Sequence, residues 1–128
     1  MIQPYLYISA SEGRGRGVYT REAIPADTVI EVSPVLVMNG EERRILDLTL
    51  LHDYIFEWGE QRDCCCVGLG YISLYNHRSP SNCEYFMEYE DEIMFVKTVR
   101  DIREGEELTI NYNGSSANTD PVWFEALP

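Results

Sequence analysis

The chain has 128 residues, of which 45% are hydrophobic, and this suits one soluble domain with a single core. Its 22 acidic residues outnumber 10 basic ones, and the net charge of −12 argues against nucleic acid binding, because phosphates select basic surfaces. No apolar run approaches the roughly 20 residues that cross a bilayer, and no signal peptide pattern opens the chain. We therefore expect no membrane contact and an intracellular, cytoplasmic protein, in a host cell if the source is a virus or an effector. The negative charge fits a basic protein partner, and it fits solubility alone equally well.

Short apolar or alternating runs, separated by turn residues, predict a β-rich protein. Glu90 and Asp91 supply a turn between two such runs, so residues 83–98 should form a hairpin. The predicted strands, in chain order, are Leu6–Ile8, Gly17–Thr20, Thr28–Val32, Val35–Met38, Cys83–Tyr89, Glu92–Thr98 and Glu107–Ile110.

One longer helix is predicted over Glu41–Leu51, with Asn39 as its N-cap and acidic residues in its first turn. Tyr71–Tyr75 fits a short helical turn. Residues Asp53–Trp58 alternate aromatic with other side chains, which is typical of either a core strand or the end of a helix.

The four cysteines do not have the spacing of a metal site. Cys64, Cys65 and Cys66 are consecutive, and neighbouring side chains on a strand point to opposite faces, so they cannot all face one ion. We expect mostly buried, reduced thiols here and at Cys83, and no metal site.

The glycine-rich segment Gly13–Gly17 has the spacing G-x-G-x-G, and no helical pattern follows it. A dinucleotide-binding turn of the G-x-G-x-x-G type is therefore excluded. Two interpretations stay open. The segment is a flexible turn between strands, or its glycines let the backbone approach a ligand closely.

Two further segments carry polar residues that suit a site. Asn76–Asn82 is a Ser/Pro/Asn-rich loop that begins with Asn-His, and Gly105–Tyr112 is a turn, a short strand and a tyrosine. By itself, His77 fits a packed core histidine, and Tyr112 fits a core aromatic with a satisfied hydroxyl.

Taken in chain order, the segments Gly13–Gly17, Asn76–Asn82 and Gly105–Tyr112 resemble the three signature stretches of the SET-domain protein-lysine methyltransferases. The resemblance covers about residues 5–124. The loop resembles N-H-S-x-x-P-N, although Arg78 replaces the usual serine and Pro80 lies one position early, while Asn82 keeps its spacing. The last segment resembles G-E-E-L-T-x-x-Y. The resemblance implies a mainly β fold, the β-clip of several small sheets, with the C-terminal segment threaded through the Asn-His loop as a pseudoknot. Residues 1–128 would be a single SET domain, and 113–128 a post-SET-like flank without zinc cysteines.

The resemblance also implies S-adenosyl-L-methionine as the cofactor and assigns roles to residues. Tyr112 would be catalytic and orient the amine, and Tyr54, which aligns less tightly, would share that role and line the lysine channel. The other channel residues would be Ile110 and Phe124. The residues that would bind the cofactor are Arg14, Gly15, Arg16, Asn76, His77, Tyr112 and Trp123.

The function implied is methyl transfer to a lysine of a protein, with a basic, histone-like protein favoured by the acidic charge. Ile110 stands where the family places a Phe or Tyr, and its lack of a hydroxyl predicts that di- or trimethylation is allowed. One alternative is a catalytically inactive SET-fold module that binds peptide, and a second is a small acidic β-domain that binds other proteins. A homodimer would fit a domain small enough to need a neighbour's surface to complete its site.

Overall fold

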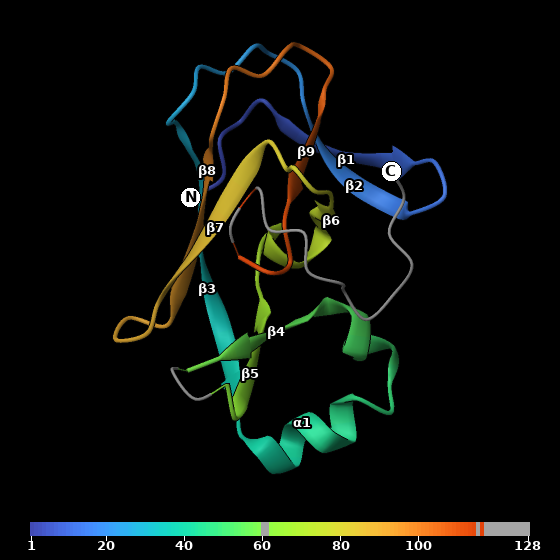
Figure 1. The fold of residues 1–128 in the computed structure, drawn as a ribbon, viewed down its shortest axis with the longest axis vertical. Helices are drawn as coiled ribbons and strands as arrows, with labels where there is room; N and C mark the ends of the chain where they lie inside the picture. Colours follow the sequence, from blue (N-terminus) through green and yellow to red (C-terminus); the bar gives the residue numbers. More distant parts are fainter. Residues whose placement is uncertain (60–61, 115, 117–128) are drawn as a thin grey trace.

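The structure is a computed structural model that describes residues 1–59, 62–114 and 116. Its strands form two sheets, one in the order β1-β2-β9-β6 and the other in the order β4-β5-β3-β8-β7. The β1–β2 hairpin lies at one end of the molecule, and helix α1 lies at the other, beside β4 and β5 (Figure 1). The mainly β fold of several sheets is therefore confirmed.

The smaller sheet brings the three sequence motifs together. β1 and β2 form an antiparallel hairpin, β2 pairs with β9, and β9 pairs in parallel with the short strand β6. In that last pair, Asn76 lies opposite Thr109 and His77 lies opposite Ile110. The strands are β1 (Leu6–Ser11), β2 (Gly15–Thr20), β6 (Asn76–His77) and β9 (Glu107–Ile110).

The larger sheet is built around β3, a ten-residue strand that changes partners along its length. Its first half pairs with β8, and its second half, from Val35 onward, pairs with β5. Pro34 stands at the change of partner, where its carbonyl accepts from the Leu69 N–H. The strands are β3 (Val29–Met38), β4 (Ile55–Trp58), β5 (Cys64–Gly68), β7 (Cys83–Glu88) and β8 (Ile93–Thr98).

Several strand predictions need correction. The two strands expected before and after Pro34 are one strand, because each half finds its own partner and the proline's missing N–H falls between them. β5 and β6 were not expected. The segment Asp53–Trp58 contains both of the structures that were left open, since Asp53 and Tyr54 end the 3₁₀-helix η1 (Leu50–Tyr54) and Ile55–Trp58 form β4. The hairpin over residues 83–98 is confirmed.

The predicted helix is shorter than expected. Helix α1 (Gly40–Leu46) ends early, and the 3₁₀-helix η1 (Leu50–Tyr54) follows it. Thr49 separates the two: its hydroxyl donates to the Leu46 carbonyl and accepts from the Leu51 N–H. The N-cap prediction is confirmed, since Asn39 Oδ1 accepts from the Glu42 N–H at 2.9 Å and the Glu42 carboxylate accepts from the Asn39 N–H in return.

The core lies between the sheets and under the second 3₁₀-helix, η2 (Ile72–Leu74), which occupies the predicted turn over Tyr71–Tyr75. Cys65, Cys66 and Cys83 are buried, Cys64 is partly buried and all four thiols are free, as expected. Burial raises the pKa of Cys66 and of Cys83 to about 12, so both stay protonated and unreactive at neutral pH. In the part of the chain that the structure describes, no helix has the length and apolar character of a membrane span.

The expected pseudoknot depends on the path of residues 117–128, which lie outside the described residues. The described part shows how the loop and the last strand are joined. Asn82 Oδ1 accepts from the Thr109 N–H at 2.8 Å, and its amide donates to the Glu107 carbonyl at 2.8 Å. The loop is thus bonded along β9, and threading stays a prediction.

Candidate active site

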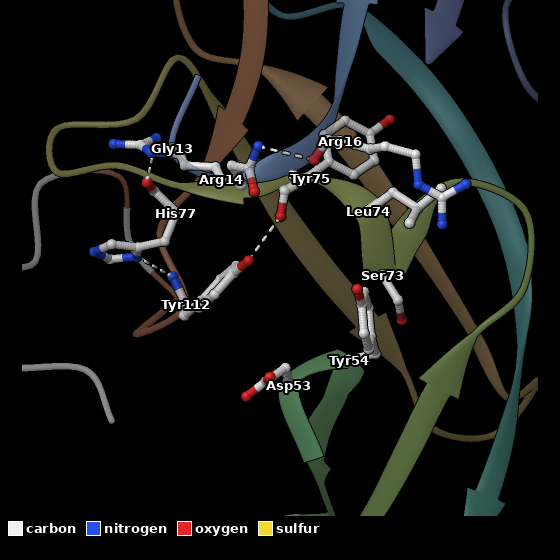
Figure 2. Close-up of a pocket in the computed structure, with 12 residues that line it drawn as sticks. Gly13, Arg14, Arg16, Asp53, Tyr54, Ser73, Leu74, Tyr75, His77 and Tyr112 are labelled. Atoms are coloured by element: carbon white, nitrogen blue, oxygen red, sulfur yellow. Dashed lines mark hydrogen bonds between the residues drawn. The ribbon is translucent and has the colours of Figure 1, made fainter. Parts of the chain in front are cut away.

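A cavity of about 400 Å³ opens where five parts of the chain meet. These parts are the β1–β2 turn, η1, η2, β6 and Tyr112, which follows β9. Its walls come from all three sequence motifs (Figure 2). The lining residues are Gly13, Arg14, Gly15, Arg16, Asp53, Tyr54, Ser73, Leu74, Tyr75, Asn76, His77 and Tyr112.

The glycine-rich turn forms one wall with its backbone. Gly15 has a φ of +75°, a conformation that L side chains rarely adopt, and a Cβ there would meet nothing within 4 Å. The backbone is therefore open to a ligand at this point. Arg14 spans the cavity's edge, and its Nη1 donates to the His77 carbonyl at 3.0 Å, which ties the turn to β6.

Asn76 is held by two hydrogen bonds from its amide nitrogen. Nδ2 donates to the Arg16 carbonyl at 3.1 Å and to Glu107 Oε2 at 2.8 Å. Gly17 leaves room for this contact, since a Cβ there would lie 2.3 Å from Glu107 Oε2 and 2.9 Å from Asn76 Nδ2. The side-chain orientation of Asn76 is thus determined by residues from both of the other motifs.

His77 orients Tyr112. The backbone N–H of Tyr112 donates to His77 Nδ1 at 3.0 Å, so this nitrogen must be unprotonated. Burial lowers the pKa of His77, and the Arg14 guanidinium lowers it further, which favours the neutral ring at pH 7. A neutral histidine in this place serves as a structural acceptor.

The Tyr112 hydroxyl donates to the Tyr75 carbonyl at 2.9 Å (Figure 2). Burial raises the pKa of Tyr112 to about 12, and Asp53 and Glu107 add to the effect while Arg14 opposes it. The phenol is therefore protonated at neutral pH. It can donate or orient, and it cannot serve as a general base there.

The opposite wall is formed by the end of η1, which presents Asp53 and Tyr54 across the cavity from Tyr112 (Figure 2). Behind Tyr112, Phe56 packs edge-on at 6.4 Å between ring centroids, and the Tyr85 hydroxyl donates to the Tyr112 carbonyl at 3.1 Å. Aromatic side chains thus enclose Tyr112 from two strands of the larger sheet.

The structure gathers most of the residues that the sequence predicted for the site: Arg14, Gly15, Arg16, Tyr54, Asn76, His77 and Tyr112 all line the cavity. Ile110 is buried in the core, 1% exposed, and is not among the lining residues. Trp123 and Phe124 lie outside the described residues. The roles given to all these residues stay predictions.

Sequence reasoning missed other parts of the site. Tyr75, whose carbonyl meets Tyr112, directly precedes the Asn-His pair, and Glu107, which holds Asn76, lies inside the G-E-E-L segment. Their positions next to the motifs were the signal that could have identified them. Asp53 directly precedes the predicted Tyr54, whereas Ser73 and Leu74 carry no such signal and reach the cavity through the fold alone.

The two departures in the loop leave its anchors in place. Arg78 donates its backbone N–H to the Ile110 carbonyl at 3.0 Å, and Asn82 bonds to Thr109 as described above. The side chains that depart from the family pattern, at Arg78 and Pro80, are exposed. The loop therefore keeps its alignment with β9 through the backbone N–H of Arg78 and the side chain of Asn82, and neither bond depends on the side chains at positions 78 and 80.

Comparison with known proteins identifies the family. The family model described as the SET domain matches residues 15–113. The chain belongs to the SET-domain family. It is 36% identical over 126 residues to a histone-lysine N-methyltransferase of Schizosaccharomyces pombe that is H3 lysine-37 specific, and the match covers 98% of this chain and 80% of the relative.

Solved structures agree with this assignment. A Plasmodium falciparum protein assigned provisionally as a histone methyltransferase superposes with a TM-score of 0.66 at 30% identity, over 87% of this chain and 95% of that one. A structure of ctPRC2 bound to S-adenosylmethionine has a TM-score of 0.72 at 20% identity, over 86% of this chain and 15% of that chain, and it shows the fold alone. The protein is a SET-domain lysine methyltransferase, and enzymes of this kind use S-adenosylmethionine.

Proposed function

We propose that this SET domain methylates a lysine of a basic, histone-like protein, with histone H3 as the favoured substrate. Two observations support the choice. The S. pombe relative is H3 lysine-37 specific, and the net charge of −12 attracts the basic tails of such proteins. The main structural support for the reaction is the hydrogen bond from the Tyr112 hydroxyl to the Tyr75 carbonyl, which lies in a cavity lined by residues of all three motifs.

The cavity fits the cofactor. Its volume lies in the range of small-molecule sites, Gly15 leaves its backbone accessible, and Arg14 and Arg16 supply positive charge for a carboxylate. S-adenosylmethionine, when bound, supplies an electrophilic methyl group on a sulfonium. We assign its binding to Arg14, Gly15, Arg16 and the Asn-His pair.

The target lysine has to lose its proton before it can attack. Its ordinary pKa is near 10.4, so at pH 7 only about one in a few thousand is neutral. Enclosure between Tyr54 and Tyr112 removes water from the ammonium and lowers its pKa. Because Tyr112 stays protonated, it orients the amine and the proton leaves to solvent. Alignment of amine, methyl carbon and sulfur is then the main contribution of the protein, and it can be worth ~7–11 kcal/mol.

Three finer assignments complete the proposal. We assign residues 113–128 to the flank of a single SET domain, and we assign the closing of the site to Trp123 and Phe124, which lie outside the described residues. Ile110, behind the site, permits di- or trimethylation because it has no hydroxyl to hold a water. A homodimer and an intracellular location stay predictions. The molar mass measured by light scattering tests the homodimer.

The test is methyl transfer from radiolabelled S-adenosylmethionine to a panel of basic proteins, with mass-spectrometric mapping of the products. Label in histone H3, at a defined lysine and with more than one methyl group, is the expected result. Strictly monomethylated product under excess enzyme would contradict the assignment of Ile110. Cofactor binding by calorimetry with no transfer to any basic protein would contradict the proposed function as a whole.

A further inference from the structure

Glu31 is a carboxylate in the middle of the core. It lies on β3, its exposed fraction is 0%, and it accepts three hydrogen bonds. Oε1 accepts from the Tyr75 hydroxyl at 2.8 Å, while Oε2 accepts from the Ser33 hydroxyl at 2.7 Å and from the Tyr71 N–H at 2.8 Å. Burial raises the pKa of Glu31, and these hydrogen bonds oppose the rise. Desolvation of a buried acid of this kind is unfavourable, and an apolar residue at this position would avoid that cost.

The carboxylate holds both ends of η2. Tyr71 is the residue before this 3₁₀-helix and Tyr75 is the residue after it, and each bonds to a different oxygen of Glu31. The same short segment presents Ser73, Leu74 and Tyr75 to the cavity. Movement of η2 would therefore move one wall of the active site.

Tyr75 connects Glu31 to the reacting centre. Its side chain, 1% exposed, ends on Glu31, and its backbone carbonyl accepts from the Tyr112 hydroxyl at 2.9 Å. The direction of that carbonyl depends on the backbone of Tyr75, and the backbone is held by the bond that the side chain makes. Glu31 therefore acts on Tyr112 through one intervening residue.

The chain also closes over the carboxylate. Gly70 has a φ of +67°, and a Cβ there would lie 2.7 Å from Glu31 Oε2 and 2.6 Å from the Ser33 hydroxyl. The entry into η2 thus passes so close to Glu31 that only glycine fits. The backbone before η2 and the bonds at its two ends converge on the same group.

We propose that Glu31 is a positioning residue for methyl transfer: it clamps both ends of η2, so that the Tyr75 carbonyl faces the Tyr112 hydroxyl in the cavity. The inference rests on the methyl-transfer activity described above. It assigns a function to a buried acid outside the three motifs. It also predicts that the bond from Tyr75 to Oε1 matters more for catalysis than the bond from Ser33 to Oε2.

Two matched variants test the proposal, since each removes one hydroxyl donor from Glu31. Tyr75→Phe removes the bond from the residue whose carbonyl meets Tyr112. Ser33→Ala removes a bond to Oε2 from a residue of β3 that lies outside η2 and the cavity, and it leaves the bond from the Tyr71 N–H in place. Both should lower the melting temperature by a few degrees. Well below melting, Tyr75→Phe should lower kcat on histone H3 by about tenfold with the Kd for S-adenosylmethionine unchanged, while Ser33→Ala keeps kcat within about twofold.

A measurement that does not depend on turnover tests the role of Glu31 independently of the proposed substrate. Crystal structures of the two variants should show the distance between the residue 75 carbonyl and the Tyr112 hydroxyl lengthened in Tyr75→Phe and kept near 2.9 Å in Ser33→Ala. If the wild type transfers nothing to histone H3 while these distances change as expected, the substrate proposal fails and the role of Glu31 stands.

Glu31→Gln serves if Tyr75→Phe does not fold. Its amide oxygen can accept from Tyr71 and Ser33, and its NH₂ group then points at the Tyr75 hydroxyl, which has to accept instead of donating. We expect a folded protein with a lower kcat and an unchanged KM for histone H3. Equal kcat losses in Tyr75→Phe and Ser33→Ala, or a wild-type kcat in Glu31→Gln, would overturn the proposal and leave Glu31 a purely structural residue.

Discussion

The backbone N–H of Tyr112 donates to Nδ1 of His77 at 3.0 Å, and this bond joins two motifs that are 35 residues apart in the sequence. It holds the end of β9 against β6, which puts the Tyr112 ring beside the His77 ring with 5.1 Å between centroids. The bond requires an unprotonated Nδ1, so the geometry of the site depends on the charge of one histidine.

Acid should therefore weaken the fold through His77. Its folded pKa lies below the ordinary value of 6.5, so between the two values the unfolded chain binds more protons. This contribution to stability is complete above about pH 6.5 and is lost as the pH falls toward the folded pKa. We expect the melting temperature to fall from pH 7 to pH 5, and His77→Gln to reduce that fall.

The control for this prediction is His52→Gln. The imidazole of His52 is exposed, pairs with Asp47 and lies outside the cavity. The variant should keep the fall in melting temperature between pH 7 and pH 5. An equal fall in the wild type and in His77→Gln would contradict the role given to His77.

Removal of the Tyr112 hydroxyl should abolish most activity without unfolding the protein. Tyr112→Phe loses the bond to the Tyr75 carbonyl and the group that orients the amine, so kcat should fall by about a hundredfold. Calorimetry should show S-adenosylmethionine binding within a few-fold of the wild type. Tyr19→Phe is the matched control, because it removes an exposed hydroxyl bonded to the Ala10 carbonyl. Comparable losses in both variants would argue against a special role for Tyr112.

Gly15→Ala should weaken cofactor binding specifically. The new methyl group would stand on the open face of the turn, and the φ of +75° would add strain of about 1 kcal/mol. Gly105→Ala is a close match, since Gly105 has a φ of +83° with nothing within 4 Å of its Cβ position and lies outside the cavity. Both variants should lose similar stability, and only Gly15→Ala should raise the Kd for S-adenosylmethionine, by roughly tenfold. Equal affinities in the two variants would place the cofactor elsewhere.

Asn82 should contribute strongly to stability. Asn82→Ala leaves the buried Thr109 N–H without its acceptor and removes the donor to the Glu107 carbonyl, at a cost of about 2–3 kcal/mol in the free energy of unfolding. Asn39→Ala removes a bond of similar geometry at an exposed helix cap and should cost only about 1 kcal/mol. Urea unfolding of both proteins measures the difference, and similar values would show that the loop is not fastened to β9 through Asn82.

Local signals in the sequence predicted the elements that depend on local physics. The hairpin over residues 83–98 follows from alternation and a polar turn, and the start of α1 follows from Asn39 and Glu42. The helix end was wrong because Thr49 bonds to the backbone on both sides and starts a new turn. β6 was missed because a two-residue strand has no pattern of its own and exists only through its pairing with β9.

The sequence alone indicated the family and the β-rich fold, because each of the three motifs is contiguous in the chain and their order resembles one family, and this resemblance in turn predicted that Gly15, Asn76 and Tyr112 share one site. Only the tertiary structure decided that Tyr75 presents its carbonyl to Tyr112, that Glu107 holds Asn76, and that Glu31 lies beneath η2. Each of these contacts joins residues 31 to 44 positions apart. Their geometry depends on how the two sheets pack, which no local pattern encodes.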